Sequence, residues 1–94
     1  MLTEWQERAL ELLLRVRITS AKKFAIQIWP GTRWSGKDKS RPEFTGIVCL
    51  NRLIHDGLVV KYRHGDNGSP AVFEYRVTEY GTLRLLNTLI WEYE

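Results

Sequence analysis

Apolar residues along the chain recur with two different spacings. Apolar side chains three or four positions apart are typical of helices that bury one face. Four segments have this spacing: residues 3–17, 21–28, 43–56 and 79–93. Residues 58–63 and 72–77 instead alternate apolar with polar side chains, which predicts two strands. The turn sequence Asp-Asn-Gly at 66–68 lies between these strands and predicts a hairpin. The expected order is helix, helix, helix, strand, strand, helix.

Capping residues support the ends of the predicted helices. The expected start signals are Thr3 with Gln6, Ser20, Ser40 with Glu43, and Thr78. A Ser or Thr followed three residues later by Glu or Gln satisfies two backbone N–H groups at a helix start. Gly57 suits the end of the third helix, where a positive φ is favoured.

The third predicted helix has an expected core face and an expected outer face. The core face has Ile47, Leu50, Leu53 and Ile54, the outer face has Thr45, Cys49, Arg52 and Asp56, and Val48, Asn51 and His55 lie on a flank. This assignment follows the positions that share a side of a helix with 3.6 residues per turn.

The first and last helices have more apolar surface than one small core needs. The additional residues are Leu10 and Leu14 in the first helix, and two neighbouring stripes in the last, Leu83, Leu86 and Ile90 beside Leu85 and Leu89. A wide apolar stripe indicates a second contact. We therefore expect a homodimer that pairs through these two helices.

Composition adds limits to this pattern. The 94 residues fit one domain, residues 1–94, and 44% hydrophobic with 27% charged residues is a globular composition. The net charge of +3 permits a polyanionic partner. Cys49 is the single cysteine, the first residues do not follow the order of a signal peptide, and no apolar run is long enough for a membrane span. We therefore expect a cytoplasmic protein that makes no membrane contact.

Two clusters of positive charge stand out. The loop at 31–42 has Arg33, Trp34, Lys37, Lys39 and Arg41 against one acid, and the hairpin has Lys61, Arg63 and His64 beside its turn. Such cations neutralise phosphates. The alternatives are a solvated loop and an edge strand that is protected from aggregation by charge. In the second strand, Phe73, Tyr75 and Val77 share one expected face, and Val72, Glu74 and Arg76 share the other.

Two stretches carry a resemblance to a known family. "LNRLIHDGLVVKYR" at 50–63 and "YRVTEYG" at 75–81 resemble winged helix-turn-helix domains of PadR-like and MarR-like regulators. "FAIQIWPG", followed by the basic loop, is similar to small winged-helix proteins of bacteriophages and mobile elements. The resemblance implies an α+β winged helix with a three-helix core. Its recognition helix would be about residues 43–56, its wing about 58–77 and its C-terminal helix about 79–93.

The same resemblance implies a DNA-binding protein, either a transcriptional regulator or an accessory protein of a phage or mobile element. Its third helix would enter the major groove of double-stranded DNA and direct Thr45, Val48, Cys49 and Arg52 to the bases. The wing and the 31–42 loop would lie on the backbone. Arg52 has the chemistry to bind guanine through two hydrogen bonds. The alternative for Arg52 is an ion pair with Asp56, four residues on.

Other functions have weaker support. Cys49, His55 and His64 do not have the spacing of a zinc site. No nucleophile–base pair and no phosphate-binding glycine loop is present in the sequence, so we expect a protein that is not an enzyme and needs no cofactor. The leading alternative is a winged-helix adaptor that contacts proteins without binding nucleic acid. A third is RNA or single-strand binding through Trp34 and the basic loop.

Overall fold

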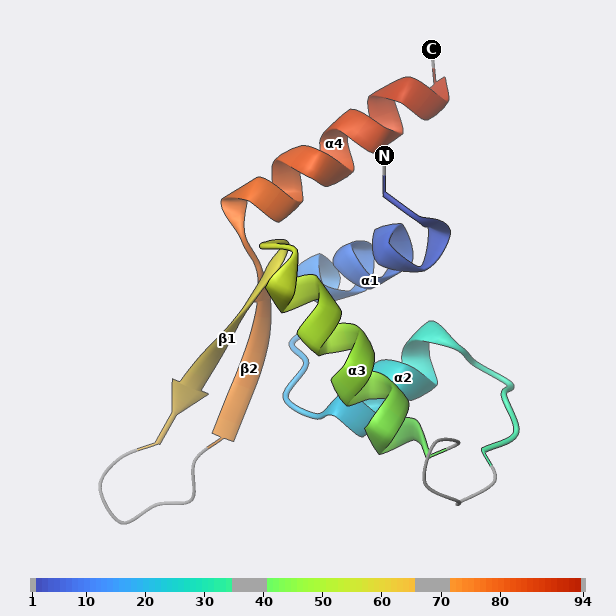
Figure 1. The fold of residues 1–94 in the computed structure, drawn as a ribbon, viewed down its shortest axis with the longest axis vertical. Helices are drawn as coiled ribbons and strands as arrows, with labels where there is room; N and C mark the ends of the chain where they lie inside the picture. The colour runs from blue at the N-terminus through green and yellow to red at the C-terminus, as the bar shows by residue number, and fades with distance from the viewer. Residues whose placement is uncertain (1, 35–40, 66–71, 94) are drawn as a thin grey trace.

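A computed structural model describes residues 2–34, 41–65 and 72–93, although not the side chains of the last two of these residues. Within these ranges the chain forms four helices and a two-stranded antiparallel hairpin (Figure 1). The elements are α1 (Glu4–Arg15), α2 (Ala21–Ile28), α3 (Pro42–His55), β1 (Val59–His64), β2 (Val72–Val77) and α4 (Glu79–Tyr93). The predicted order and the α+β class are confirmed.

The helix ends follow most of the predicted capping. Thr3 and Gln6 form the capping box of α1, and the Ser20 side chain accepts a hydrogen bond from the backbone at the start of α2. Gly57, which follows the C-cap residue Asp56 of α3, has a φ of 77°. The expected Ser40 cap of α3 is wrong, because α3 begins at Pro42 with residue 41 as its cap; Ser40 itself lies outside the described residues.

The hairpin is joined to the rest of the protein by the chain between α1 and α2. α1 ends at Arg15, rather than at residue 17 as predicted, because the chain becomes extended at Val16. Ile18 then forms a bridge to β2, in which Tyr75 N donates to Ile18 O at 3.1 Å. The strands pair in a register that places Lys61 opposite Tyr75. The hairpin is therefore hydrogen-bonded to the body near the middle of β2. Its predicted turn at 66–68 lies outside the described residues.

The core lies between α1, α2 and α3 and is closed by residues of the hairpin and α4. Its fully buried side chains include Leu10, Ile18, Phe24, Ile28, Leu50 and Leu53. Leu10 therefore belongs to the core and does not widen an outer stripe. Leu14 is exposed, and in α4 Leu85 is buried whereas the stripe of Leu83, Leu86 and Ile90 is exposed.

Gly46 sets the rotation of α3 about its own axis. A Cβ atom on Gly46 would lie 2.0 Å from Ala21 O, so the backbones of α2 and α3 are in direct contact there. The buried face of α3 consequently includes Pro42, Gly46, Leu50 and Leu53. Two predictions for this helix are wrong for this reason: Ile47 is 49% exposed, and Cys49 packs against the core.

Candidate nucleic-acid interface

The exposed side of α3 is a continuous stripe of side chains, which we call the outer face. It has Phe44, Ile47, Val48, Asn51, Arg52 and His55, all exposed. Thr45, which was expected on this side, is half-buried. Cys49 is half-buried as well, and burial raises the pKa of its thiol. Of the four residues expected to face the bases, the structure exposes Val48 and Arg52.

Arg52 lies at the C-terminal end of the outer face. Its Nε donates to Asp56 Oδ2 at 3.1 Å, and Gln6 Nε2 donates to the same oxygen at 3.5 Å. The structure therefore has the ion pair that was the alternative to base contact. An exposed pair at this spacing contributes about 0.3–0.5 kcal/mol, too little to prevent Arg52 from changing partner.

The hairpin holds its cations against aromatic rings. Lys61 Nζ lies 4.1 Å from the centre of the Phe73 ring, and the Arg76 guanidinium lies 4.8 Å from that of Tyr62. A cation–π contact orients the side chain and leaves its charge in place. Lys61 and Arg63 are both exposed. Lys61 consequently presents an ordered positive charge to the solvent, and the exposed Arg63 adds a second one.

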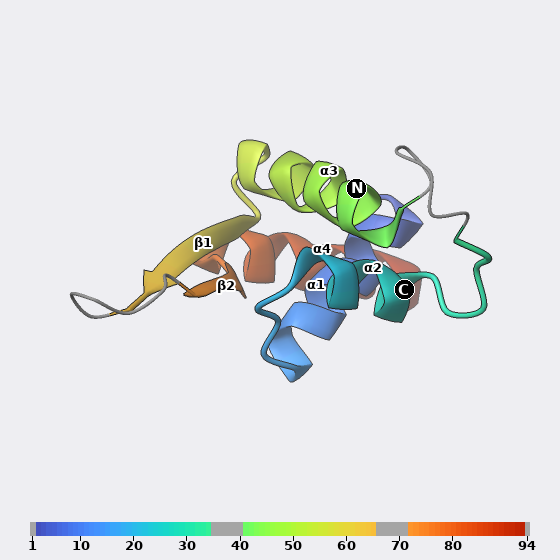
Figure 2. The ribbon, with the colours of Figure 1, turned by 90° about the horizontal axis from the view of Figure 1, so that it is seen from below.

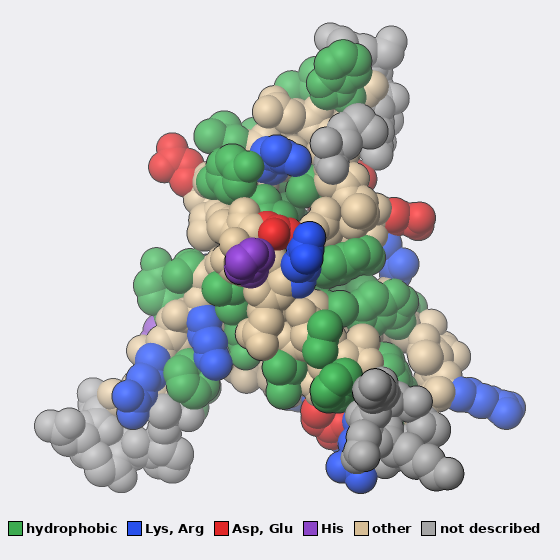
Figure 3. Space-filling view, in the orientation of Figure 1, with side chains coloured by type: hydrophobic (Ala, Val, Ile, Leu, Met, Phe, Trp, Pro, Cys, Tyr) green, Lys and Arg blue, Asp and Glu red, His purple; other side chains and the backbone are tan. Residues whose placement is uncertain are grey.

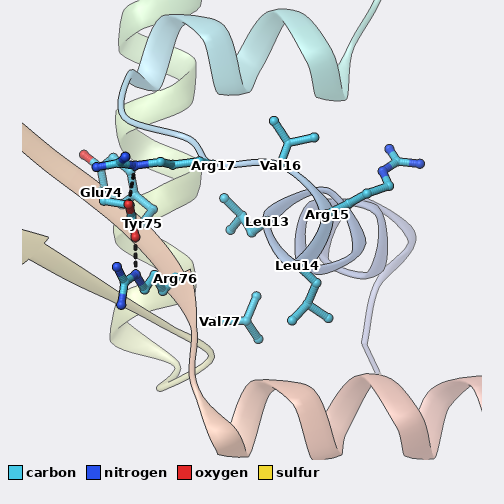
Figure 4. A pocket seen from close by; sticks show the side chains of 9 residues that line it. All are labelled: Leu13, Leu14, Arg15, Val16, Arg17, Glu74, Tyr75, Arg76 and Val77. Carbon is cyan, nitrogen blue, oxygen red and sulfur yellow. Dashed lines mark hydrogen bonds and ion pairs between the residues drawn. The ribbon is translucent and has the colours of Figure 1, made fainter.

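Glu74 lies between two arginines near the middle of β2 (Figure 4). Arg17 Nε is 2.5 Å from Glu74 Oε1, and Arg76 Nε donates to Oε2. Glu74 was expected on the outward face of β2. This prediction is wrong, because Glu74 is only 5% exposed. The hydrogen bond from Arg76 has the largest effect on the pKa of this carboxyl and, with the charges of both arginines, holds it below its ordinary value against the opposing effect of burial.

His64 is turned towards this cluster and not towards the tip. Its Nε2 is buried, makes no hydrogen bond within the described part of the chain, and lies 3.8 Å from Glu74 Oε1. Three hairpin residues were expected on the DNA backbone, and two of them, Lys61 and Arg63, are exposed to solvent. His64 instead packs over the acid.

The other predicted cluster begins after α2. Arg33 and Arg41 are exposed, and Trp34 is half-buried. Lys37 and Lys39 lie outside the described residues. Trp34 borders a hollow of about 400 Å³ together with Lys22, Ile26, Arg41, Pro42 and Glu43. Lys22 Nζ is 3.8 Å from Glu43 Oε1 at the start of α3. The hollow combines apolar walls with cations at its edge.

These parts are arranged around α3. Figures 1 and 2 show α3 on one side of the molecule, with the hairpin to one side of it and the chain that leaves α2 to the other. In Figure 3, lysine and arginine side chains appear over the hairpin and beside the start of α3, with hydrophobic side chains between them. The outer face of α3 therefore lies between two positively charged regions.

A separate groove of about 570 Å³ runs between the end of α1 and β2 (Figure 4). Its lining includes Leu14, Val16 and Val77 beside the Arg17–Glu74–Arg76 cluster. None of the residues predicted to bind DNA borders this groove. The described residues include no cluster of three or more His, Cys, Asp or Glu able to hold a metal ion. No described helix combines the length and apolar character needed to cross a membrane.

Pattern reading missed Phe44, Ile47 and Glu74. The available signal for the first two was Gly46, since a glycine inside an otherwise helical pattern often marks close packing.

Comparison with protein-family models, with curated proteins and with solved structures finds no match for this chain.

Proposed function

We propose that the protein is a winged-helix DNA-binding protein, acting as a transcriptional regulator or as an accessory protein of a phage or mobile element. The observation that carries this proposal is the exposed outer face of α3 between two positively charged regions. In this proposal α3 enters the major groove. The hairpin is the wing, and Lys61 and Arg63 on one side and Arg33 on the other contact phosphates.

The dimensions and chemistry of DNA support this assignment. The major groove is about 12 Å wide and admits one α-helix, with a phosphate backbone on each side. Cations that flank a helix are thus placed where the phosphates lie. Binding through such contacts releases counterions, so affinity falls steeply as salt rises.

A salt titration tests the proposal directly. Fluorescence anisotropy with a labelled duplex should show binding at low salt, with a linear fall of log K against log salt concentration. Arg63→Ala should reduce the slope by about 0.9 for the one lost phosphate contact. Arg15→Ala, at the end of α1, removes the same charge outside the proposed surface and should leave the slope unchanged. Absence of duplex binding at low salt would exclude the function.

We also propose that two copies pair through α4 and the end of α1. Leu83, Leu86 and Ile90 are 54%, 49% and 56% exposed, and Leu14 is exposed at the end of α1. Complete burial of such a side chain contributes about 1.5–3 kcal/mol. The half that remains exposed therefore contributes about 1 kcal/mol for each of the three α4 residues, or about 6 kcal/mol in a symmetric pair. Association costs about 4–15 kcal/mol, so this gain exceeds only the lower end of that range, and the dimer we propose is weak and reversible, with Leu14 adding to the α4 stripe.

The second candidate is an adaptor that contacts another protein through α3. It is favoured by Phe44, Ile47 and Val48, which are 45–50% exposed and together form an apolar patch. The cations on both sides of this patch favour DNA instead. The salt titration separates the two, because an adaptor of this kind has no affinity for a duplex.

A further inference from the structure

The apolar half of the outer face continues into an exposed carboxamide. Phe44, Ile47, Val48 and Asn51 are spaced i, i+3, i+4 and i+7, which places them in one line along α3. We infer that α3 reads A·T base pairs in the major groove, with Ile47 and Val48 against thymine methyl groups and Asn51 on the paired adenine. This inference rests on the proposed DNA-binding function and gives it a class of target.

The apolar side chains match one chemical group of the major groove. Among the base edges exposed there, the C5 methyl of thymine is the apolar one, and the others are hydrogen-bond donors and acceptors. Ile47 and Val48 have no donor or acceptor in their side chains, so they gain from a methyl group and leave a G·C edge unsatisfied. The cations on both sides of α3 are complementary in charge to the two phosphate backbones of such a site.

Asn51 supplies the polar half of the match. Its side chain is exposed and makes no hydrogen bond with any described residue. A carboxamide offers one acceptor and one donor side by side, which is the complement of adenine N6 and N7. Asn51 follows Val48 by three positions and Ile47 by four, so an adenine and a thymine methyl can be contacted from adjacent positions of one helix.

Guanine reading has less support from α3. Arg52 is the one lysine or arginine among its 14 residues. Its Nε donates to Asp56, whose carboxylate offsets its charge, so Arg52 must leave this weak pair before it can bind guanine. Guanine is bound in the major groove mainly by arginine or lysine. The residues of the outer face that precede Arg52, namely Ile47, Val48 and Asn51, therefore suit thymine and adenine.

The test compares short duplexes of alternating A·T, A·U and G·C. Uracil differs from thymine by loss of the methyl group alone, and alternating sequences present the same pairs in every register. We expect A·T to bind more tightly than A·U by about fourfold for each methyl group that is contacted. Ile47→Ala should lower the A·T to A·U ratio by about fourfold, and Ile47→Ala combined with Val48→Ala should bring it close to one. Asn51→Ala should weaken A·T and A·U alike by roughly tenfold relative to G·C.

Ile26→Ala is the matched control for Ile47→Ala, because it shortens the same type of half-exposed side chain on α2, outside both the outer face of α3 and the proposed dimer contact. Its A·T to A·U ratio should equal that of the wild type, and circular dichroism should show all variants folded. Equal affinity for A·T and A·U, or a ratio that Ile47→Ala leaves unchanged, would overturn the inference while salt-dependent binding persists. A preference for G·C would do the same. No binding to any duplex would remove the proposed function, and the inference with it.

Discussion

Replacement of Gly46 by alanine tests the contact that orients α3. Two effects of Gly46→Ala have opposite signs. Alanine favours a helix over glycine by about 1 kcal/mol, so helix propensity alone predicts a more stable protein. The structure predicts the reverse, because the new Cβ would lie 2.0 Å from Ala21 O and 2.7 Å from Ala21 C.

The size of the effect follows from what has to move. Ordinary contact needs about 3.5 Å, so α2 and α3 must separate by about 1.5 Å, and backbone atoms cannot rotate out of the way as a side chain can. This separation would loosen the packing of Phe24, Leu50 and Leu53, which are fully buried. Overpacking of this kind costs about 3 kcal/mol or more where the neighbours cannot yield. After the propensity gain, we expect a net loss of about 2 kcal/mol in the free energy of unfolding.

Urea and thermal denaturation measure this loss. A change of 2 kcal/mol corresponds to a fall in Tm of about 8–16 °C for a domain of this size. Asn51→Ala is the control, because it introduces alanine into the same helix at an exposed position and should leave stability unchanged or slightly raised. A Gly46→Ala protein as stable as the wild type would refute the close approach of α2 and α3, and with it the assignment of the outer face.

Three further outcomes are expected. The pKa of Glu74 is lower in the folded protein than in the unfolded chain, so this carboxylate stabilises the fold above about pH 4.3, and the stabilisation is lost as pH falls through the folded-state pKa. Glu74→Gln should flatten that acid limb in pH-dependent denaturation, and an unchanged limb would contradict the cluster. Thr78→Ala should lower the free energy of unfolding by about 1–2 kcal/mol in urea denaturation. Thr78 Oγ1 donates to Gly57 O at 2.7 Å and accepts a hydrogen bond from Gly81 N in the first turn of α4, and the variant loses both. A variant as stable as the wild type would show that this cap is not needed. Leu86→Asp should give a monomer in analytical ultracentrifugation, whereas Asn87→Asp, with the same added charge, should still pair; a wild type that sediments only as a monomer would exclude the dimer.

Local signals predicted most of the secondary structure. Helical spacing and the Thr3–Gln6 box located α1, and alternation on both sides of a turn signal located the hairpin. These features depend on residues that are close in the sequence, which is why a single sequence reveals them. The end of α1 was missed because Ile18 leaves the helix to pair with Tyr75, a contact between distant parts of the chain.

The faces of the elements were harder to predict than their positions. Periodicity gives weight to large apolar residues, and it therefore placed Ile47 inside and Cys49 outside. Gly46 has no side chain to count, yet the backbone contact it permits decides which side of α3 is buried. Glu74 was placed outside because of its charge. Its burial depends on Arg17, far away in the sequence, which no local pattern connects to it.

The exposure of the charged residues was easier to predict than the side of α3 that faces the solvent. Arg33, Arg52, Lys61 and Arg63 are exposed, as their charge leads one to expect. The sequence did not identify the apolar character of the outer face, because that depends on the rotation of α3.

The attachment of the hairpin has a mechanical consequence. β2 is fixed to residues 17 and 18 by one backbone hydrogen bond and one ion pair, and these residues directly follow α1. A tilt of strands β1 and β2 would therefore displace the end of α1, close to the exposed Leu14. If two copies pair through this region, as proposed above, a displacement of the hairpin also displaces residues of the dimer contact. DNA contact by the hairpin and pairing of the two copies would then be coupled, and each would alter the free energy of the other by an equal amount.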